Sequence, residues 1–290
     1  MDEPAAHKLA REARFDLLKV IGSAGVVLLH ASMYAAGKPG PGTIARLGAT
    51  LGYALGRNME SIFIMVAGAL LLARASENAP WAFVRQRWAR LVPATLFWTA
   101  FYLAWRRFGG EALNGSGMLG DIARGMPYFH LWFLYAMLGL YALMPGARLM
   151  VRDAQAARAQ YFTAGALAVA SVLSTAALVI LGYEREPFFA YIPKLLVYLV
   201  AGYLIYRDQP RPPLARLLLL GVACVGGEML VMRLLQPSAL TLATQALTQT
   251  VLALCALGWT VTVFLLVMRL PMGQRLKRLA GGLAPFMLVS

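Results

Sequence analysis

Apolar residues gather into long runs, and short polar segments rich in Gly, Pro and basic residues separate these runs. A transmembrane helix needs about 20 mostly apolar residues. A helical membrane bundle hydrogen-bonds its backbone within each helix, so runs of this length predict an all-α polytopic protein of about 8–9 spans. The candidate runs are 15–34, 47–73, 91–108, 128–146, 161–181, 188–206, 214–235 and 242–268, followed by a shorter apolar piece at 279–290.

The composition leads to the same class of protein. The chain has 290 residues, of which 60% are hydrophobic and 14% charged, whereas soluble domains are about 45–50% apolar and about 25% charged. No internal repeat or long polar linker divides it, so we expect one membrane domain over 1–290. The two cysteines, Cys224 and Cys255, both fall inside apolar runs. They are typical of small core residues and form no disulfide framework or metal site.

The net charge of +14 could indicate nucleic-acid binding, but the basic residues lie in short clusters between the apolar runs. Such clusters are typical of topology signals and of contacts with anionic lipid. With a cytoplasmic N-terminus, the inside segments hold 17 of the 27 Lys and Arg residues and the outside segments hold seven. The positive-inside rule therefore favours this orientation, with the lipid bilayer rather than nucleic acid as the partner.

The first run contains polar groups that are costly in lipid, namely Asp16, Lys19 and His30. Lys19 and His30 are 11 residues apart, which in a helix is three turns plus about 20°, so they share one face with Ser23. His30 lies about 22 Å along the span from Phe15, toward the outer surface. Because ionisable residues inside a membrane are functional candidates by default, we interpret this line as part of a site.

Other spans place ionisable residues near the depth of His30. The alternative interpretations are structural. Arg57 and Glu60, three residues apart, could pair with each other on one helix. Lys194 could extend toward the outer surface, and His130 could be an interfacial residue beside Trp132. The residues that converge on this level, from five spans, are His30, Arg57, Glu60, His130, Lys194 and Glu228.

Four local patterns, in this order, resemble the acyltransferase type 3 family of polytopic membrane proteins. The resemblance covers about the first half of the chain, and the second half shares only the rhythm of spans. The patterns are FDLLKVIGSAGVVLLH (15–30), SIFIMVAGALLL (61–72), FVRQRWARLVP (83–93) and HLWFLYAMLGLYALMP (130–145).

The resemblance implies an O-acyltransferase of the plasma (inner) membrane. Such an enzyme moves an acyl group, often acetyl, from cytoplasmic acyl-CoA to a hydroxyl of a cell-surface glycan, glycolipid or related acceptor. His30 would be the catalytic histidine, and Lys19 would stand in the place of the family's Arg. A neutral imidazole is suited to remove the hydroxyl proton near pH 7, and Glu228 or Glu60 could orient it.

The remaining candidate residues divide between the two substrates. The phosphates of coenzyme A cannot enter lipid, so we expect the donor to bind at the cytoplasmic side through Asp16, Lys19, Arg87 and Arg90. We expect the acceptor to bind through Arg57, His130, Trp132 and Lys194, and we expect no metal. Two other functions stay open at this point: a transporter whose ionisable residues form a ring in the outer half of the membrane, and a catalytically silent member of the fold.

Overall fold

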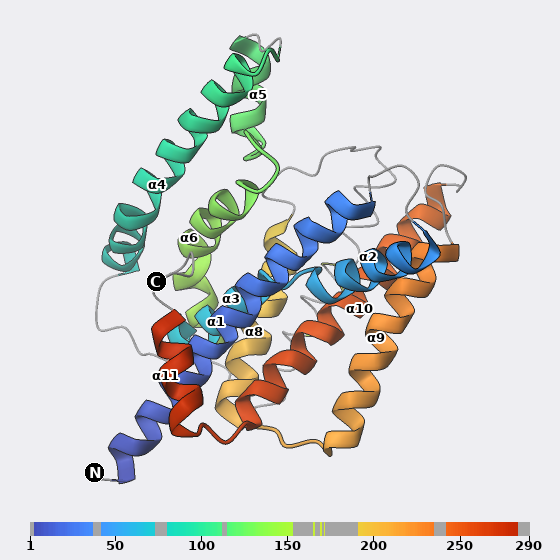
Figure 1. Ribbon diagram of the computed structural model, residues 1–290. Helices are drawn as coiled ribbons and strands as arrows, with labels where there is room; N and C mark the ends of the chain where they lie inside the picture. The colour runs from blue at the N-terminus through green and yellow to red at the C-terminus, as the bar shows by residue number, and fades with distance from the viewer. Residues whose placement is uncertain are drawn as a thin grey trace. The chain divides into compact units, whose positions relative to one another are not determined.

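The computed structural model describes residues 3–36, 42–72, 80–111, 115–152, 191–234 and 242–283, together with positions 165, 169 and 171. The secondary structure of this part of the chain is helical (Figure 1). The elements are α1 (Glu3–Ala36), α2 (Thr43–Gly56), α3 (Ser61–Ala67), the π-helical turn η1 (Gly68–Leu72), α4 (Pro80–Phe108), α5 (Gly115–Ala123), α6 (Trp132–Arg152), α8 (Ile192–Asp208), α9 (Leu214–Leu234), α10 (Leu242–Arg269) and α11 (Gln274–Leu283).

Four helical segments are long and apolar enough to cross a membrane, and all four coincide with predicted spans. They are Ala13–Ala36, Ile44–Leu72, Leu214–Leu234 and Leu247–Arg269. The chain is therefore an all-helical protein with membrane-spanning character. Helix α4 covers the predicted span at 91–108, α6 covers 132–146 of the span predicted at 128–146, and α8 covers 192–206 of the span predicted at 188–206, of which 188–190 lie outside the described residues.

Two other predicted segments have different outcomes. The predicted span at 161–181 lies outside the described residues, apart from 165, 169 and 171. The helix that contains the start of the apolar piece expected at 279–290 begins earlier, since α11 starts at Gln274. The first half of α11 carries basic residues. Leu276, Leu279, Ala280 and Leu283 recur at helical spacing on α11, which is the pattern of an amphipathic helix. Residues 284–290 lie outside the described part of the chain.

The chain divides into two compact units, which we describe separately. Unit 1 combines 1–73 with 198–290, and unit 2 consists of 74–197. Unit 1 therefore contains α1 to η1, most of α8, and α9 to α11. Unit 2 contains α4, α5, α6 and the first turn of α8.

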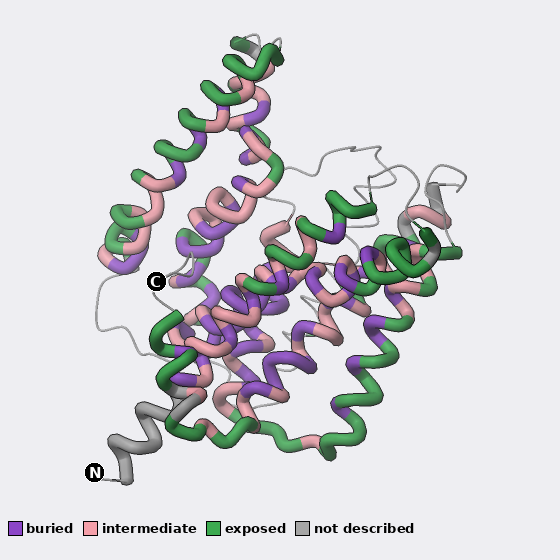
Figure 2. Tube along the Cα trace, viewed as in Figure 1, coloured by how far each residue is buried: buried purple, intermediate pink, exposed green. Residues whose placement is uncertain are grey.

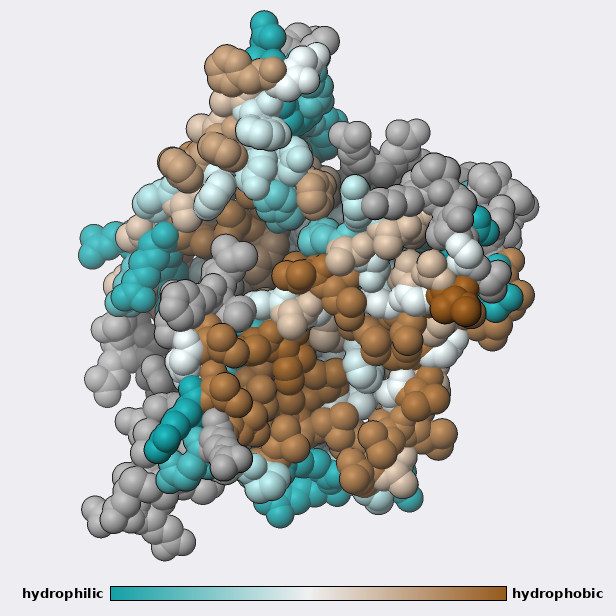
Figure 3. Space-filling view, in the orientation of Figure 1, coloured by the Kyte–Doolittle hydropathy of each residue, from teal (hydrophilic) through white to brown (hydrophobic). Residues whose placement is uncertain are grey.

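Helix α9 shows how the sequence sorts interior from exterior in unit 1. Its buried positions follow the helical period and face the other helices, whereas Leu219, Val222 and Leu234 are about 70% exposed. Exposed apolar residues in such numbers fit a surface against lipid rather than water. Figures 2 and 3 show this exposed apolar surface over unit 1. The buried residues of α9 are Leu217, Gly221, Cys224, Val225 and Glu228.

The start of the first span, the end of α8 and the residues just after α10 lie at the same end of unit 1 (Figure 1). The charge pattern assigns all three segments to the inside. At the start of the first span, the Phe15 ring lies 5.8 Å from the Tyr206 ring at the end of α8. Nearby, the Arg14 Nε donates a hydrogen bond of 3.2 Å to the carbonyl of Leu270, just after α10. This arrangement is consistent with the alternation of inside and outside segments in the sequence.

Glycine residues allow the helices of unit 1 to approach closely. A Cβ on Gly56 would lie 2.5 Å from the carbonyl oxygen of Gly25 and 2.7 Å from the amide nitrogen of Leu29, so α2 contacts α1 backbone to backbone. Small residues at such crossings are the usual device for helix association in membranes. A second crossing joins η1 to α8, where a Cβ on Gly68 would collide with the carbonyl of Leu199.

We predict that Gly56→Ala destabilises the protein by about 1–3 kcal/mol, because the added methyl meets backbone atoms that cannot move aside without separating α1 from α2. The matched control is Gly48→Ala on the same helix, where nothing lies within 4 Å of the added Cβ. Thermal unfolding of the two purified variants in detergent tests this. Equal melting temperatures would show that the crossing is not tight.

Candidate active site

The predicted site residues divide between the two units. The residues in unit 1 are Asp16, Lys19, His30, Arg57, Glu60 and Glu228, and those in unit 2 are Arg87, Arg90, His130, Trp132 and Lys194. All of them fall within the described residues. The geometry of each group is therefore described within its own unit.

The polar line on the first span has the predicted geometry. Helix α1 runs without interruption through Lys19, Ser23 and His30, and all three side chains are half-buried. They lie beside the face that packs on α2, where Gly22 and Gly25 are buried. The Lys19 Nζ donates a hydrogen bond of 3.3 Å to the Asp16 carboxylate. The ammonium is therefore held toward the start of the span, about 16 Å below His30 along the helix.

The second predicted span is not one continuous helix. Helix α2 ends at Gly56, residues 57–60 form turns, and α3 begins at Ser61. Asn58 has a positive φ of 59°, a conformation that Asn tolerates better than most residues. A break at membrane depth exposes backbone polar groups, which need partners because lipid supplies none. The break carries Arg57 and Glu60, two of the predicted site residues.

Side chains from two other helices bind this break. The Trp259 indole N–H of α10 donates a hydrogen bond of 2.9 Å to the carbonyl of Leu55 at the end of α2. The Thr260 hydroxyl, which bonds the Ala256 carbonyl at 2.8 Å, also lies 3.5 Å from the carbonyl of Asn58. From α8, the Tyr198 hydroxyl accepts a hydrogen bond of 3.4 Å from the Asn58 side chain.

The sequence pattern does not single out Trp259, Thr260 or Tyr198, because uncharged polar residues in apolar runs are common. The signal that could have found them is their position. Each lies within an apolar run, where polar side chains are few. Their partners come from a segment more than 100 residues away.

The charged groups at the break pair across the unit rather than along one helix. The Arg57 Nη1 donates a hydrogen bond of 2.9 Å to the Glu228 Oε1 on α9. The alternative in which Arg57 pairs with Glu60 is therefore not the arrangement observed. The Glu228 side chain is fully buried, and the Arg57 side chain is 19% exposed. Charges in such surroundings persist only when they are paired.

The second oxygen of Glu228 has no hydrogen-bond partner in the described part of the chain, although it is buried. Carboxylate oxygens can each accept more than one hydrogen bond, so this oxygen is available to a donor from a bound molecule or a water. The structure thus joins two predicted site residues, Arg57 and Glu228, and places Glu60 in the same turn. No group of three or more His, Cys, Asp or Glu among the described residues could hold a metal ion.

In unit 2, the acceptor-side candidates lie in an aromatic cluster. The His130 ring stands edge-on to Tyr102 at 4.8 Å and to Tyr128 at 5.2 Å. The Trp132 ring lies 4.5 Å from Tyr191, whose own ring has the Lys194 ammonium 5.3 Å from its centroid. Tyr and Trp combine a large apolar face with a polar group, which suits surfaces that bind partly polar molecules.

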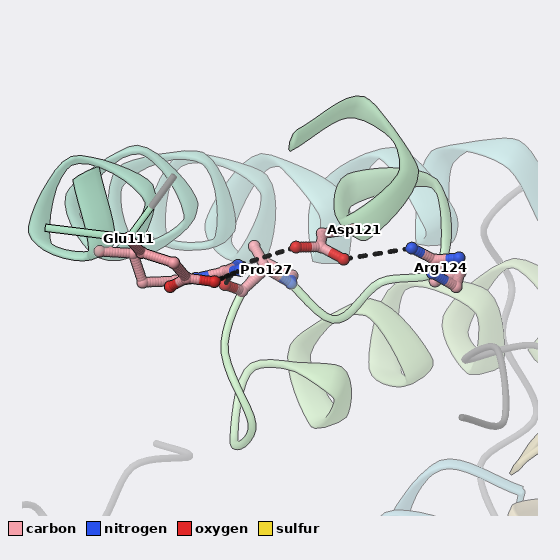
Figure 4. A network of polar contacts seen from close by, with 5 residues as sticks. Glu111, Asp121, Arg124 and Pro127 are labelled. Atoms are coloured by element: carbon pink, nitrogen blue, oxygen red, sulfur yellow. Dashed lines mark hydrogen bonds and ion pairs between the residues drawn. The ribbon is translucent and has the colours of Figure 1, made fainter. Parts of the chain in front are cut away.

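A network of ion pairs and hydrogen bonds fixes the segment that leads to His130 (Figure 4). We call it the ionic clasp; it consists of Arg106, Glu111, Asp121, Arg124 and the carbonyl of Pro127. The Arg106 guanidinium, at the end of α4, donates two hydrogen bonds of 2.6 and 2.7 Å to Glu111. It donates two more, both of 2.8 Å, to the carboxylate of Asp121 and to the carbonyl of Pro127. Arg124 adds a hydrogen bond of 3.3 Å to Asp121.

The clasp joins α4, α5 and the turn before α6. One helical turn before Arg106, the Tyr102 ring stacks on the Tyr128 ring, with ring centroids 4.4 Å apart and an interplanar angle of 16°. Two charges of each sign balance in the clasp, so we assign it a structural role, the positioning of His130. Its charges also affect the Asp121 carboxyl. Burial alone would raise the pKa of Asp121, but the hydrogen bonds and charges of Arg106 and Arg124 outweigh this and lower it.

The four candidate membrane-spanning helices and the charged line on α1 indicate a membrane protein with a candidate site among its apolar helices. The sequence model of the acyltransferase type 3 family, described as an acyltransferase domain, matches residues 12–288, nearly the whole chain. The chain therefore belongs to this family, which supports membrane acyltransferase activity. No curated protein and no solved structure gives a significant match.

We predict that the contribution of Asp121 to the free energy of unfolding changes with pH only under acidic conditions. Its pKa is lowered in the folded protein, so this contribution is fully present above the ordinary value of 3.8. It is lost as the pH falls from there through the lower folded pKa. The melting-temperature difference between the wild type and Asp121→Asn should stay constant from about pH 7 to 5 and shrink below about pH 4. A difference that already shrinks above pH 5 would mean that the pKa is raised instead.

Proposed function

We propose that this protein is a membrane O-acyltransferase that moves an acetyl group from cytoplasmic acetyl-CoA to a hydroxyl of a cell-surface glycan or glycolipid. The observation that carries the proposal is the family match over nearly the whole chain. The geometry of α1 supports it, because Lys19 and His30 lie on one face of a continuous helix.

His30 is the general base in this proposal. Its imidazole takes the proton of the acceptor hydroxyl while the hydroxyl oxygen attacks the thioester carbonyl carbon. The new carbon–oxygen bond forms, the carbon–sulfur bond breaks, and the coenzyme A thiolate receives the proton from the imidazolium. Glu60, in the break between α2 and α3, and Glu228, on α9, assist His30. Glu228, which Arg57 holds in place, has one oxygen available to a hydroxyl or to a water.

The donor binds from the side of the N-terminus. Lys19, held by Asp16, is a cation at the start of the first span. Arg87 and Arg90 lie in the first half of α4, which the charge pattern assigns to the inside. In this proposal each of these groups supplies a positive charge on the inside for the phosphates of coenzyme A, because phosphates are too costly to bury in lipid. The slender thioester arm then extends toward His30.

In this proposal His130, Trp132 and Lys194 of unit 2 contribute to acceptor binding, and Arg57 of unit 1 has the same role because the sequence pattern assigns it to the outer half of its span. Aromatic faces pack on the C–H face of a sugar ring, and the cations and the imidazole bind its hydroxyls. In this proposal the protein is a multi-pass protein of the inner membrane with a cytoplasmic N-terminus. The distribution of Lys and Arg and the common end of the inside segments in unit 1 support this orientation.

We predict that His30→Ala lowers acyl transfer by about 10²–10⁴-fold, which is the usual contribution of a general base. The measurement uses the purified protein in nanodiscs with labelled acetyl-CoA and a panel of methyl pyranosides. The matched control is Val27→Ala, one turn away at an exposed position of α1. Turnover that is equal in His30→Ala and the wild type would exclude His30 as the base.

A binding measurement tests the donor side independently of turnover. The Arg87→Ala/Arg90→Ala double variant should bind acetyl-CoA more weakly than the wild type. The single variant Arg85→Ala, which removes an exposed basic residue of the same helix, is the control. Unchanged binding in the double variant would contradict the donor assignment.

One observation favours the transporter alternative, namely the broken helix between α2 and α3. Discontinuous helices bind substrates near the midplane of many transporters. Covalent labelling of an acceptor separates the two functions, since a transporter moves its substrate across nanodisc or vesicle membranes without acylating it.

A further inference from the structure

Unit 2 contains a second polar feature, in which two arginines surround a buried pair of aromatic rings. Phe83 of α4 and Tyr141 of α6 pack edge to face, with ring centroids 6.5 Å apart and an interplanar angle of 82°. Both residues are buried. The pair fixes the beginning of α4 against α6.

Two guanidinium groups lie over these rings. The guanidinium carbon of Arg148 is 4.2 Å from the centroid of Phe83. That of Arg87 is 5.6 Å from Phe83 and 5.9 Å from Tyr141. The two cations therefore lie within about 10 Å of each other around one ring. Cation–π contacts of this kind stabilise a cation next to an aromatic ring.

The two cations also affect each other. Burial, followed by the positive charge of Arg87, lowers the pKa of the Arg148 guanidinium from its usual value. Like charges at this separation repel, and partial burial strengthens the repulsion. An anion bound near both groups would be attracted by both positive charges.

A hydrogen-bond donor at the same place lacks a partner. The Nε of Arg87 is buried, and within the described residues it has no acceptor. A buried donor without an acceptor is unfavourable, and more so when the group is charged. Aromatic rings compensate the charge but do not accept a directed hydrogen bond from this atom. The local chemistry therefore fits an oxygen-rich anion.

We propose that Arg148, together with Arg87, binds a phosphate group of the acyl donor. The planar fork of Arg matches phosphate oxygens in a bidentate manner. The charge pattern assigns the first half of α4 and the end of α6 to the inside, where coenzyme A is found. This inference rests on the proposed function and adds Arg148, which the sequence analysis does not single out. The phosphate of an anionic lipid headgroup has the same chemistry and is the other source to test.

The experiment compares Arg148→Gln with Arg85→Gln in nanodiscs of phosphatidylcholine. Arg85 is an exposed basic residue of α4 that serves as the matched control. The probes are coenzyme A and pantetheine, which lacks the phosphates, and binding is measured by calorimetry. We expect Arg148→Gln to weaken coenzyme A binding about tenfold or more, because charge-assisted hydrogen bonds are lost. Pantetheine binding should stay unchanged, and Arg85→Gln should match the wild type.

The outcomes separate the possible errors. Equal losses for coenzyme A and pantetheine would mean that Arg148→Gln disturbs the fold, and would overturn the inference. Unchanged coenzyme A binding would also overturn it. If the variant instead loses affinity for phosphatidylglycerol added to the nanodiscs, the phosphate belongs to a lipid and not to the donor. Coenzyme A binding that depends on Arg148, without acyl transfer to any acceptor, would support this inference while the proposed function fails.

Discussion

The ion pair between Arg57 and Glu228 is the interaction around which unit 1 is arranged. Glu228 has no exposed surface and lies on a helix whose other side carries exposed apolar residues. An unpaired carboxylate in such a place would cost several kcal/mol, so the pair requires α2 and α9 to stay in contact at this level. The break after α2 makes the pairing possible, because it places Arg57 outside the regular helix.

The break in turn depends on the helices around it. Trp259 donates a hydrogen bond to the carbonyl of Leu55 in α2, and Tyr198 accepts one from the side chain of Asn58. Close crossings at Gly56 and Gly68 bring the backbones of α1 and α8 against the same broken segment. Irregular backbone at membrane depth is tolerated only where protein surrounds it, and unit 1 meets this condition with side chains from several helices. A break held in this way by several helices keeps Arg57 in place to pair with Glu228.

The sequence could predict those features that depend on one helix alone. The shared face of Lys19 and His30 follows from helical periodicity, and the continuous α1 confirms it. The sequence places Glu228 within an apolar run, and the structure shows that it is one of the buried residues of α9. The partner of Arg57 could not be predicted, since Glu60 is close in sequence and Glu228 is 171 residues away. Gly56 and Asn58 are residues that favour a helix end, but single Gly and Asn residues also occur within helices, so on their own they do not predict the break.

The pair between Arg57 and Glu228 can be tested directly with a double-mutant cycle on the unfolding free energy, measured by denaturation of the purified protein in mixed micelles. The variants are Arg57→Met, Glu228→Met and the double variant. Each single variant leaves an unpaired charge and should lose about 3–5 kcal/mol. The double variant should lose much less than the sum of the two, because both charges are gone. Losses that simply add would contradict the account, since they would show that the two residues act independently.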